Sequence, residues 1–383
     1  MKILYHHRVA SKDGQYVHIE GLTRAFIDQG HEIVWVTPRV AEDEKFGGES
    51  RSVGNLKKRI PGAVYELLEF GYAFLAFAKL MLAVFRHRPD VIYERYNLYL
   101  PSGIWASRLS GIPLISEVNA PLKSERAKND GIALPWLASW TEGYVWRKAD
   151  AVLPVTEVLA QHVIERRGHR NGLTVIHNGV HPEMIEPDAA GRERAKQQLG
   201  LAGKTVLGFT GFMRDWHGLD SVIRVIANGE QSDWHALLVG DGPARDELQK
   251  LAAELGVESQ VTFTGLVARE QIKRYIQAFD IALQPKVVPY ASPLKMFEYM
   301  ALGKLIVAPD MANIREILTD DHDAVLFDPE ASSAFEAAIN TALSDQDLRE
   351  KLQANVIETL HARRFKWAEN AKRVIGIADD LLR

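Results

Sequence analysis

One helix in the second half of the sequence begins with residues whose types and spacing could bind a diphosphate. Ser292 is a preferred N-cap residue, and Pro293 is favoured at the first helical position because its missing N–H costs nothing there. The free N–H groups at this helix start, from Leu294 onward, attract anions, and Lys295 adds a positive charge. Glu298 follows three residues later on the same face and could accept from ribose hydroxyls. We therefore predict a nucleoside-diphosphate site; the alternative is a surface helix with a Ser-Pro cap.

Elements that could position this helix alternate along the whole chain. Short apolar runs at 2–5, 33–37, 91–93, 113–116, 151–155 and 173–176 are separated by helical patterns. After a charged segment at 178–203, which we interpret as a linker, the alternation restarts with runs at 205–210, 235–239, 260–263, 281–284, 305–308 and 324–327. Apolar strands between helices are typical of parallel sheets covered on both faces. The fold class is therefore α/β, with two doubly wound domains and a ligand cleft at the carboxyl ends of the strands.

Composition limits the function classes. The chain has 383 residues, of which 46% are hydrophobic and 25% charged, and its net charge is −4. These values are typical of a soluble protein with two cores, and they do not favour nucleic acid as a partner. No cysteine is present, which excludes disulfides, thiolate metal sites and a cysteine nucleophile. No signal peptide is visible, so we expect a cytoplasmic protein.

Glycines follow several predicted strands, where a backbone could approach a ligand closely. Gly14 supplies a turn after the first strand, and we expect Gly14 and Gln15 to approach the bound nucleotide, with His18 nearby. The alternative is a solvated basic loop in which His18 packs or caps. Gly240 and Gly242 end a strand of the second domain and would let the backbone approach a ligand.

The run EYMALGKLIVAP at 298–309 resembles the donor-site motif of the GT4 family of retaining glycosyltransferases, which have the GT-B fold. Glu298 matches the second Glu of the family pattern, whereas Tyr290 occupies the place of the first. A subset of the family carries S-P-x-K-x-x-E-Y-M-A, which this chain fits. The runs GHEI at 30–33, RPDVIY at 88–93 and GDGP at 240–243 extend the resemblance over essentially the whole chain.

The resemblance implies a division of labour between two Rossmann-like domains that face a central cleft. Residues 1–178 would form the acceptor-binding domain, and residues 179–365 would bind the nucleotide sugar. The last helix, about 366–383, is expected to pack back onto the first domain. No metal is expected to be bound, and the nucleotide sugar is a co-substrate rather than a cofactor.

The chain departs from the family at several site positions. Asn119 stands where many members have a His that contacts the donor sugar, and Glu117 is the nearest ionisable group. Phe212 and His217 replace the Arg and Lys that bind pyrophosphate, so Arg214 is expected to substitute in part. Asn119 can hydrogen-bond a hydroxyl but cannot exchange a proton near neutral pH.

The resemblance also places the remaining site residues. Gly211 and His217 would lie at the donor, and backbone groups of Leu266 and Val267 would cradle its base. Gly14 and Gln15 would also lie at the donor, and His18 and Asn119 at the acceptor. Glu94 and Arg95 follow a strand of the first domain and would touch the acceptor; the alternative is a mutual ion pair. The polar loop 122–132 is a candidate acceptor loop.

A long helical pattern at 65–87 carries a wide apolar face, and we interpret this face as core packing. The face comprises Leu67, Leu68, Phe74, Leu75, Ala78, Leu82 and Phe85. The alternative is a surface that leans on a membrane, supported by nearby basic residues Arg51, Lys57, Lys58 and Arg59.

Together these patterns predict a retaining transfer of sugar from a UDP- or GDP-sugar to an acceptor hydroxyl. Lys295, Asn119, Arg214 and Glu117 are the candidate catalytic residues. The acceptor would be a saccharide or lipid-linked saccharide in polysaccharide or glycolipid assembly, with peripheral membrane contact on the cytoplasmic side as an option. Two alternatives stay open: a non-catalytic sugar-nucleotide-binding protein and a GT-B sugar-nucleotide epimerase.

Overall fold

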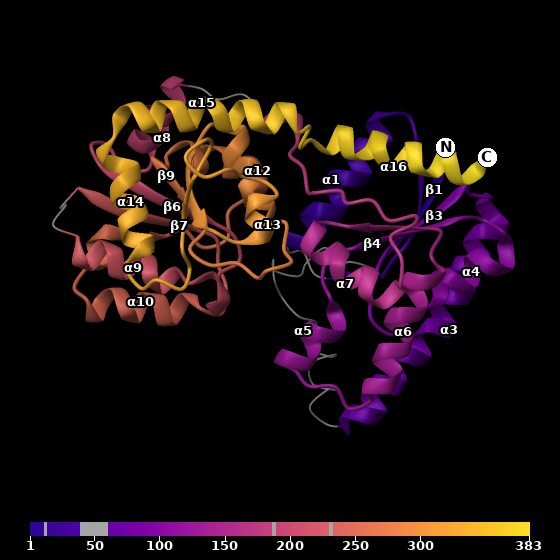
Figure 1. Cartoon of the computed structure of the whole chain (residues 1–383). Coiled ribbons are helices and arrows are strands. Elements are labelled where there is room, and N and C mark those ends of the chain that lie inside the picture. Colours follow the sequence, from indigo (N-terminus) through magenta and orange to yellow (C-terminus); the bar gives the residue numbers. More distant parts are fainter. Residues whose placement is uncertain (11–13, 39–59, 186–188, 230–232) are drawn as a thin grey trace. The chain divides into compact units, whose positions relative to one another are not determined.

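The computed structural model describes residues 1–10, 14–38, 60–185, 189–229 and 233–383, and it divides into two compact units (Figure 1). The first unit comprises Met1–Asn178, Tyr290–Ser292 and Trp367–Arg383. The second comprises Gly179–Pro289 and Pro293–Lys366. The basic residues Arg51, Lys57, Lys58 and Arg59 lie outside the described residues.

The first unit is built on a five-stranded parallel sheet with the order β2-β1-β3-β4-β5. Its strands are β1 (Lys2–His6), β2 (Glu32–Val36), β3 (Val91–Arg95), β4 (Leu114–Val118) and β5 (Ala151–Pro154). The predicted strand at 173–176 is absent, and Leu173 makes only an isolated bridge to Val152. Strands β3 and β4 are buried throughout, as expected where helices cover both faces of a parallel sheet.

Seven helices of the described chain accompany this sheet. They are α1 (Gly14–Asp28), α3 (Gly62–His87), α4 (Ser102–Ser110), α5 (Leu122–Asn129), α6 (Pro135–Lys148), α7 (Glu157–Arg167) and α16 (Trp367–Leu382). Helix α16 packs along α1 (Figure 1). Gly21 allows this approach, because a Cβ there would lie 2.5 Å from the Trp367 indole nitrogen. Gln29 also donates to the Ala368 carbonyl at 2.8 Å.

The second unit has a six-stranded parallel sheet with the order β11-β10-β9-β6-β7-β8. Its strands are β6 (Thr205–Thr210), β7 (Trp234–Val239), β8 (Val261–Phe263), β9 (Ile281–Leu283), β10 (Leu305–Pro309) and β11 (Val325–Phe327). Its helices are α8 (Ala189–Gln198), α9 (Leu219–Asn228), α10 (Arg245–Glu254), α11 (Arg269–Gln277), α12 (Leu294–Ala301), α13 (Ala312–Arg315), α14 (Ala334–Ser344) and α15 (Gln346–Ala362). The predicted α/β class with two doubly wound domains is confirmed, and α8 lies within the segment interpreted as a linker.

Helix α3 contradicts the core-packing interpretation of its apolar face. The buried side of α3 is instead formed by a different set of residues, which includes Ala73, Ala76 and Leu80. Large side chains that the prediction placed in the core are exposed: Leu67, Leu68, Phe74, Leu75, Leu82 and Phe85. Leu82 and Phe85 expose 68% and 75% of their surface. The prediction failed because α3 is apolar on more than one side, and periodicity does not show which side is covered.

By length and composition alone, α3 is the one helix in the described ranges that could cross a membrane. Its most apolar 18-residue window has a mean hydropathy of 1.8 and is 33% buried. One such helix is weak evidence, because a core helix of a soluble protein can reach the same length and hydropathy.

Candidate functional site

Helix α12 carries Lys295 and Glu298 on the face opposite its core contacts. Met296, Phe297 and Tyr299 are fully buried and hold the helix on the second unit's sheet. The Tyr299 hydroxyl accepts from the N–H at the end of β6, at 2.9 Å from the Thr210 nitrogen. This bond fixes α12 against the loop that follows β6.

The Lys295 ammonium lies against that loop. Its Nζ is 3.7 Å from the centroid of the Phe209 ring, and a Cβ at Gly211 would lie 3.0 Å from it. Burial lowers the pKa of Lys295 to about 7, and nearby Glu298 opposes this shift. Burial raises the pKa of Glu298 to about 6, against the effects of Arg269 and Lys295. Lys295 is thus poised to gain charge when an anion arrives.

Two glycine turns let the strand ends of β6 and β7 meet backbone to backbone. A Cβ at Gly240 would lie 2.1 Å from the Gly211 carbonyl oxygen, and a Cβ at Gly242 would lie 2.2 Å from the Met213 oxygen. Both glycines also have positive φ angles, 131° and 157°. No other residue fits these positions, so the loops beside Lys295 depend on them.

The loop after Gly211 presents one strong cation. The Arg214 guanidinium lies between two rings, 4.9 Å from the centroid of Phe212 and 5.0 Å from that of Trp216. The His217 Nδ1 accepts from the Arg214 N–H at 3.3 Å. Burial lowers the pKa of His217 well below its usual value, and Lys295 and Arg214 lower it further. His217 is therefore neutral at pH 7, where Arg214 is charged and Lys295 is charged in part.

The predicted base-binding turn lies beside the same glycines. Gly240 pairs with Gly265 in an isolated antiparallel bridge, and its N–H donates to Thr264 Oγ1 at 3.1 Å. Leu266 is 44% exposed, whereas Val267 packs partly into the core. The second unit thus brings Gly211, His217, Gly240, the Leu266–Val267 turn and Lys295 to one edge of its sheet.

Ser292 does not cap α12, which corrects the sequence prediction. The helix begins at Leu294, and Pro293 takes the N-cap position without a side-chain hydrogen bond. The Ser292 hydroxyl instead accepts from the Asn178 N–H at 3.2 Å. Ser292 is also buried and belongs to the first unit. Its role as a donor-binding cap is not supported, because its oxygen has another partner.

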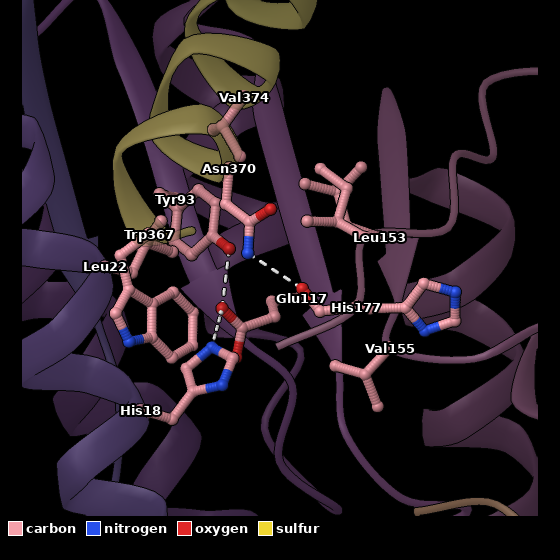
Figure 2. Close-up of a pocket in the computed structure, with 11 residues that line it drawn as sticks. His18, Leu22, Tyr93, Glu117, Leu153, Val155, His177, Trp367, Asn370 and Val374 are labelled. Atoms are coloured by element: carbon pink, nitrogen blue, oxygen red, sulfur yellow. Dashed lines mark hydrogen bonds and ion pairs between the residues drawn. The ribbon is translucent and has the colours of Figure 1, made fainter. Parts of the chain in front are cut away.

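In the first unit, Glu117 is the centre of a buried network (Figure 2). Its carboxylate accepts from Arg95 and from the Tyr93 hydroxyl, both at 2.6 Å, and from the Asn119 amide at 2.5 Å. The His18 Nε2 lies 2.9 Å from the same carboxylate. Burial acts to raise the pKa of Glu117, but His18 and Arg95 outweigh it and hold the pKa well below its usual value.

The catalytic role of Glu117 and the acceptor-binding role of His18 stay predictions, and this environment bears on both. The two residues are only 3% and 5% exposed, and their polar atoms face protein partners rather than solvent. Because its pKa is depressed, Glu117 is a weak proton acceptor. Asn119 is half-buried and its amide donates to Glu117, so its carbonyl oxygen is the part that a substrate could still reach.

Glu94 and Arg95 are also engaged, but not with each other. Successive side chains of a strand point to opposite faces of the sheet, which separates the pair. The Glu94 carboxylate lies 2.6 Å from His6 Nδ1, and both side chains are buried. Arg95 pairs with Glu117 on the other face. The alternative of a mutual ion pair is therefore wrong. The predicted acceptor contact stays a prediction.

Comparison with known proteins identifies the family. Residues 191–359 match the family described as glycosyl transferases group 1, and residues 12–184 match glycosyltransferase family 4. The chain belongs to this glycosyltransferase family. A relative, D-inositol 3-phosphate glycosyltransferase of Stackebrandtia nassauensis, is 25% identical over 96% of this chain and 87% of its own length. The α-D-kanosaminyltransferase of Streptomyces kanamyceticus is 23% identical over 71% of each chain.

Solved structures share the GT-B fold of this glycosyltransferase. HepE from Anabaena, in complex with UDP-glucose, has a TM-score of 0.77 and 21% identity, and the match covers 100% of this chain and 99% of HepE. Sucrose-phosphate synthase from Thermosynechococcus elongatus has a TM-score of 0.75 and 18% identity, with 99% and 98% covered. That this glycosyltransferase belongs to the subset with the S-P-x-K-x-x-E-Y-M-A donor motif stays a prediction.

Two predicted donor residues of the glycosyltransferase lie in the first unit, at the start of α1. Gly14 and Gln15 are exposed and follow β1 in the chain. Their predicted contact with the donor stays a prediction. In the described part of the chain, no group of three or more His, Asp and Glu side chains is placed to hold a metal ion. The expectation that no metal is required stays a prediction.

Sequence reasoning missed Asn178 and Phe209 in this glycosyltransferase. Asn178 begins the segment that we interpret as a linker, yet it is buried and bonded to Ser292 and His18. Phe209 forms the surface on which Lys295 lies. An aromatic residue two positions before a strand-end glycine was the available signal for Phe209; Asn178 had none, because its partners are distant in sequence.

Proposed function

We propose that this glycosyltransferase moves a sugar from a nucleoside-diphosphate sugar to an acceptor hydroxyl, with retention at the anomeric carbon. The observation that carries the proposal is the position of Lys295, on Phe209 and beside Gly211, at the carboxyl edge of the second unit's sheet. The solved complexes of HepE with UDP and UDP-glucose favour a UDP-sugar as the donor.

The leaving diphosphate is the group whose charge the protein must stabilise. Negative charge gathers on its oxygen as the bond to the anomeric carbon breaks, and fixed cations aimed there lower the barrier. Lys295 and Arg214 are cations at this edge, and the α12 N–H groups add a positive dipole end. Glu298, one turn deeper, would accept from the ribose hydroxyls.

Retention in this proposal follows from a reaction on one face of the sugar. The acceptor oxygen bonds to the anomeric carbon on the side from which the diphosphate leaves, and the leaving phosphate oxygen takes the acceptor proton. The buried, ion-paired state of Glu117 supports this route, because Glu117 is not free to act as a base. Asn119 would orient a sugar hydroxyl through its half-buried amide.

The acceptor in this proposal is a saccharide or a lipid-linked saccharide used in polysaccharide or glycolipid assembly. The exposed stripe of α3 supports contact with a lipid surface. Leu68, Leu75 and Leu82 recur every seven residues and so share one side of the helix. Lys79 and Arg86, also seven apart and exposed, border this stripe and would attract anionic headgroups.

An aromatic side chain extends the same surface onto α6. Trp140 is 43% exposed, and its ring centroid lies 6.0 Å from that of Phe70 on α3. Tryptophan is favoured at the membrane–water boundary. We therefore propose a cytoplasmic enzyme that lies on the inner face of the membrane through α3.

Vesicle binding tests the membrane part of the proposal. The double substitution Leu75→Glu and Leu82→Glu should abolish cosedimentation with phosphatidylglycerol vesicles, whereas Leu109→Glu on α4, also exposed, should not. Vesicles of phosphatidylcholine alone should bind the wild type less. Equal binding by the double variant would exclude α3 as the contact. A change of oligomeric state without vesicle binding would make the stripe a protein interface.

Thermal-shift binding tests the donor site. We expect one of the UDP-, GDP- and ADP-sugars to stabilise the wild type but neither Lys295→Ala nor Glu298→Ala. Lys372→Ala, which removes an exposed lysine of α16, is the matched control and should respond like the wild type. If no sugar nucleotide shifts the wild type with candidate acceptors present, the proposed donor site is wrong.

A further inference from the structure

The chain passes between the two units at four places: after Asn178, Pro289, Ser292 and Lys366. These four chain segments can be independent of one another, or they can be joined by hydrogen bonds into one group. The hydrogen bonds around Asn178 distinguish these cases, because they join three of the four passages.

The first and third passages are bonded directly. The Asn178 N–H donates to Ser292 Oγ at 3.2 Å, and the Asn178 amide nitrogen donates to the Ser292 carbonyl at 2.5 Å. These residues are 114 apart in sequence, yet each is the last residue of its segment within the first unit. The two chain segments therefore leave the first unit from one point.

The first and fourth passages are bonded on both sides. Within the first unit, the Asn370 amide donates to the His177 carbonyl at 2.7 Å (Figure 2). Within the second unit, the Val180 N–H donates to the Phe365 carbonyl at 3.1 Å, and Val180 bridges to Lys366. The segments before and after these passages thus run together.

His18 occupies the centre of this group. Its Nδ1 lies 2.7 Å from the Asn178 side-chain oxygen, and its ring lies edge-on to Trp367 with centroids 4.9 Å apart. The Asn178 amide nitrogen is engaged by Ser292, so the Asn178 oxygen must accept and Nδ1 must donate. On its other side, Nε2 lies 2.9 Å from Glu117, which anchors the imidazole to β4.

The surroundings of His18 leave no room for a sugar. Figure 2 shows the imidazole between α1, the Trp367 indole of α16 and the Glu117 carboxylate. The cavity beside it, lined by Tyr93, Glu117 and Asn370 among others, measures about 10 Å³. That volume holds about one water molecule.

We propose that His18 and Asn178 are positioning residues: they join three passages of the chain into one hinge, and His18 does not bind the acceptor. Asn178 fixes the ends of two passages through both its amide atoms and its backbone, and His18 connects that point to Glu117 and Trp367. Ser292 is two residues before α12, so its bonds with Asn178 hold the segment that leads into the Lys295-bearing helix.

Hydrogen exchange tests the hinge without reference to any activity. Asn178→Ala removes the side-chain bonds to the Ser292 carbonyl and to His18. It should speed amide exchange about tenfold at residues 290–292 directly, and at 367–370 because His18 packs against Trp367. Ser292→Ala removes only one acceptor and should speed exchange mainly at Asn178. The matched control is Asn355→Ala on α15, which removes a hydrogen bond from the side-chain amide to the His322 carbonyl. It should leave exchange in both segments unchanged.

Two results would overturn the hinge. Exchange that rises at 177–181 alone would show that the passages are independent. Exchange that rises throughout the first unit would show that Asn178 supports the general stability of that unit instead.

Kinetics test the role of His18, and this part rests on the proposed function. We expect His18→Ala and Asn178→Ala to lower kcat by a similar factor of about ten and to leave the acceptor KM within about twofold. The kcat of the double variant should be no lower than that of either single variant, because both substitutions disrupt the same hydrogen-bonded group. An acceptor KM raised by His18→Ala alone would restore the substrate-contact role. Failure of the wild type to transfer sugar would count against the proposed function, while the exchange result would stand.

Discussion

The Lys295 ammonium lies 3.7 Å from the centre of the Phe209 ring, and its attachment to α12 places Glu298 one turn deeper on the same helix. The ring stabilises the ammonium from one side, while burial disfavours its charge. A lysine in this balance is a receptive site for an anion, and that property leads to the first prediction.

Donor binding should depend on pH through Lys295. Below its pKa of about 7 the ammonium is already charged, so binding takes up no proton. Above that pH the lysine is largely neutral and must gain a proton, so affinity for UDP should fall by up to about tenfold per pH unit. Calorimetry between pH 6 and about pH 9, in two buffers of different ionisation enthalpy, measures both quantities. Lys295→Arg should flatten the profile, since arginine stays charged; an unchanged slope would exclude Lys295 as the titrating group.

Removal of the Phe209 ring should weaken donor binding. Phe209→Leu keeps a buried apolar side chain but removes the π face under Lys295, worth about 0.5–2 kcal/mol. We expect UDP to bind about three- to tenfold more weakly, measured by titration calorimetry. Phe279→Leu, at another fully buried ring of the second unit, is the control for core damage. Equal losses in the two variants would show that packing alone, and not the cation contact, matters.

Gly240→Ala should disrupt the donor edge. The new Cβ would lie 2.1 Å from the Gly211 carbonyl oxygen, and the glycine has a φ of 131° that alanine rarely adopts. We expect loss of UDP binding and a lower melting temperature. Gly376→Ala in α16 is the control, because nothing lies within 4 Å of the Cβ that alanine would add. Alanine is the better helix former, so this variant should stabilise the protein by up to about 1 kcal/mol. Unaltered UDP affinity in Gly240→Ala would contradict the close approach of these loops.

Glu117→Gln should destabilise the first unit. It leaves the Arg95 charge without its buried partner, and breaking such a pair costs about 3–5 kcal/mol. The folded pKa of Glu117 is depressed, so its stabilisation is present above the unfolded pKa and is lost only in acid. The difference between wild type and variant should therefore be constant from about pH 5 to about pH 8. Chemical denaturation at several pH values measures it, and a difference that shrinks near pH 6 would be inconsistent with this ion pair.

The sequence supported the fold well and the site in part. Apolar strands alternating with helices determine a pair of parallel sheets, because only such sheets bury both faces of their strands. Lys295, Gly211 and Gly240 lie together because each is fixed by local features: a helix start and two strand ends. Long-range partners were not predictable. Ser292 matched a cap locally, but Asn178, distant in sequence, takes its oxygen.

The first unit shows a second limit of sequence reasoning. Strand periodicity places Glu94 and Arg95 on opposite faces but does not say that both faces are buried. Likewise, the apolar residues of α3 could lie toward the core or toward solvent, and the structure exposes Phe74 and Phe85. Charge and polarity at a strand end are therefore weak indicators of a substrate contact when a partner can be supplied by another strand.

The most direct test of the account is donor turnover by Lys295→Met. Methionine is similar in length but cannot carry charge. Once a stabilising sugar nucleotide has been identified, the rate of nucleoside-diphosphate release with acceptor should fall by about 10²–10³ in the variant, the range measured when a single charge-stabilising group is removed. Release at the wild-type rate would show that the leaving diphosphate is stabilised elsewhere, and the donor site proposed on α12 would be wrong.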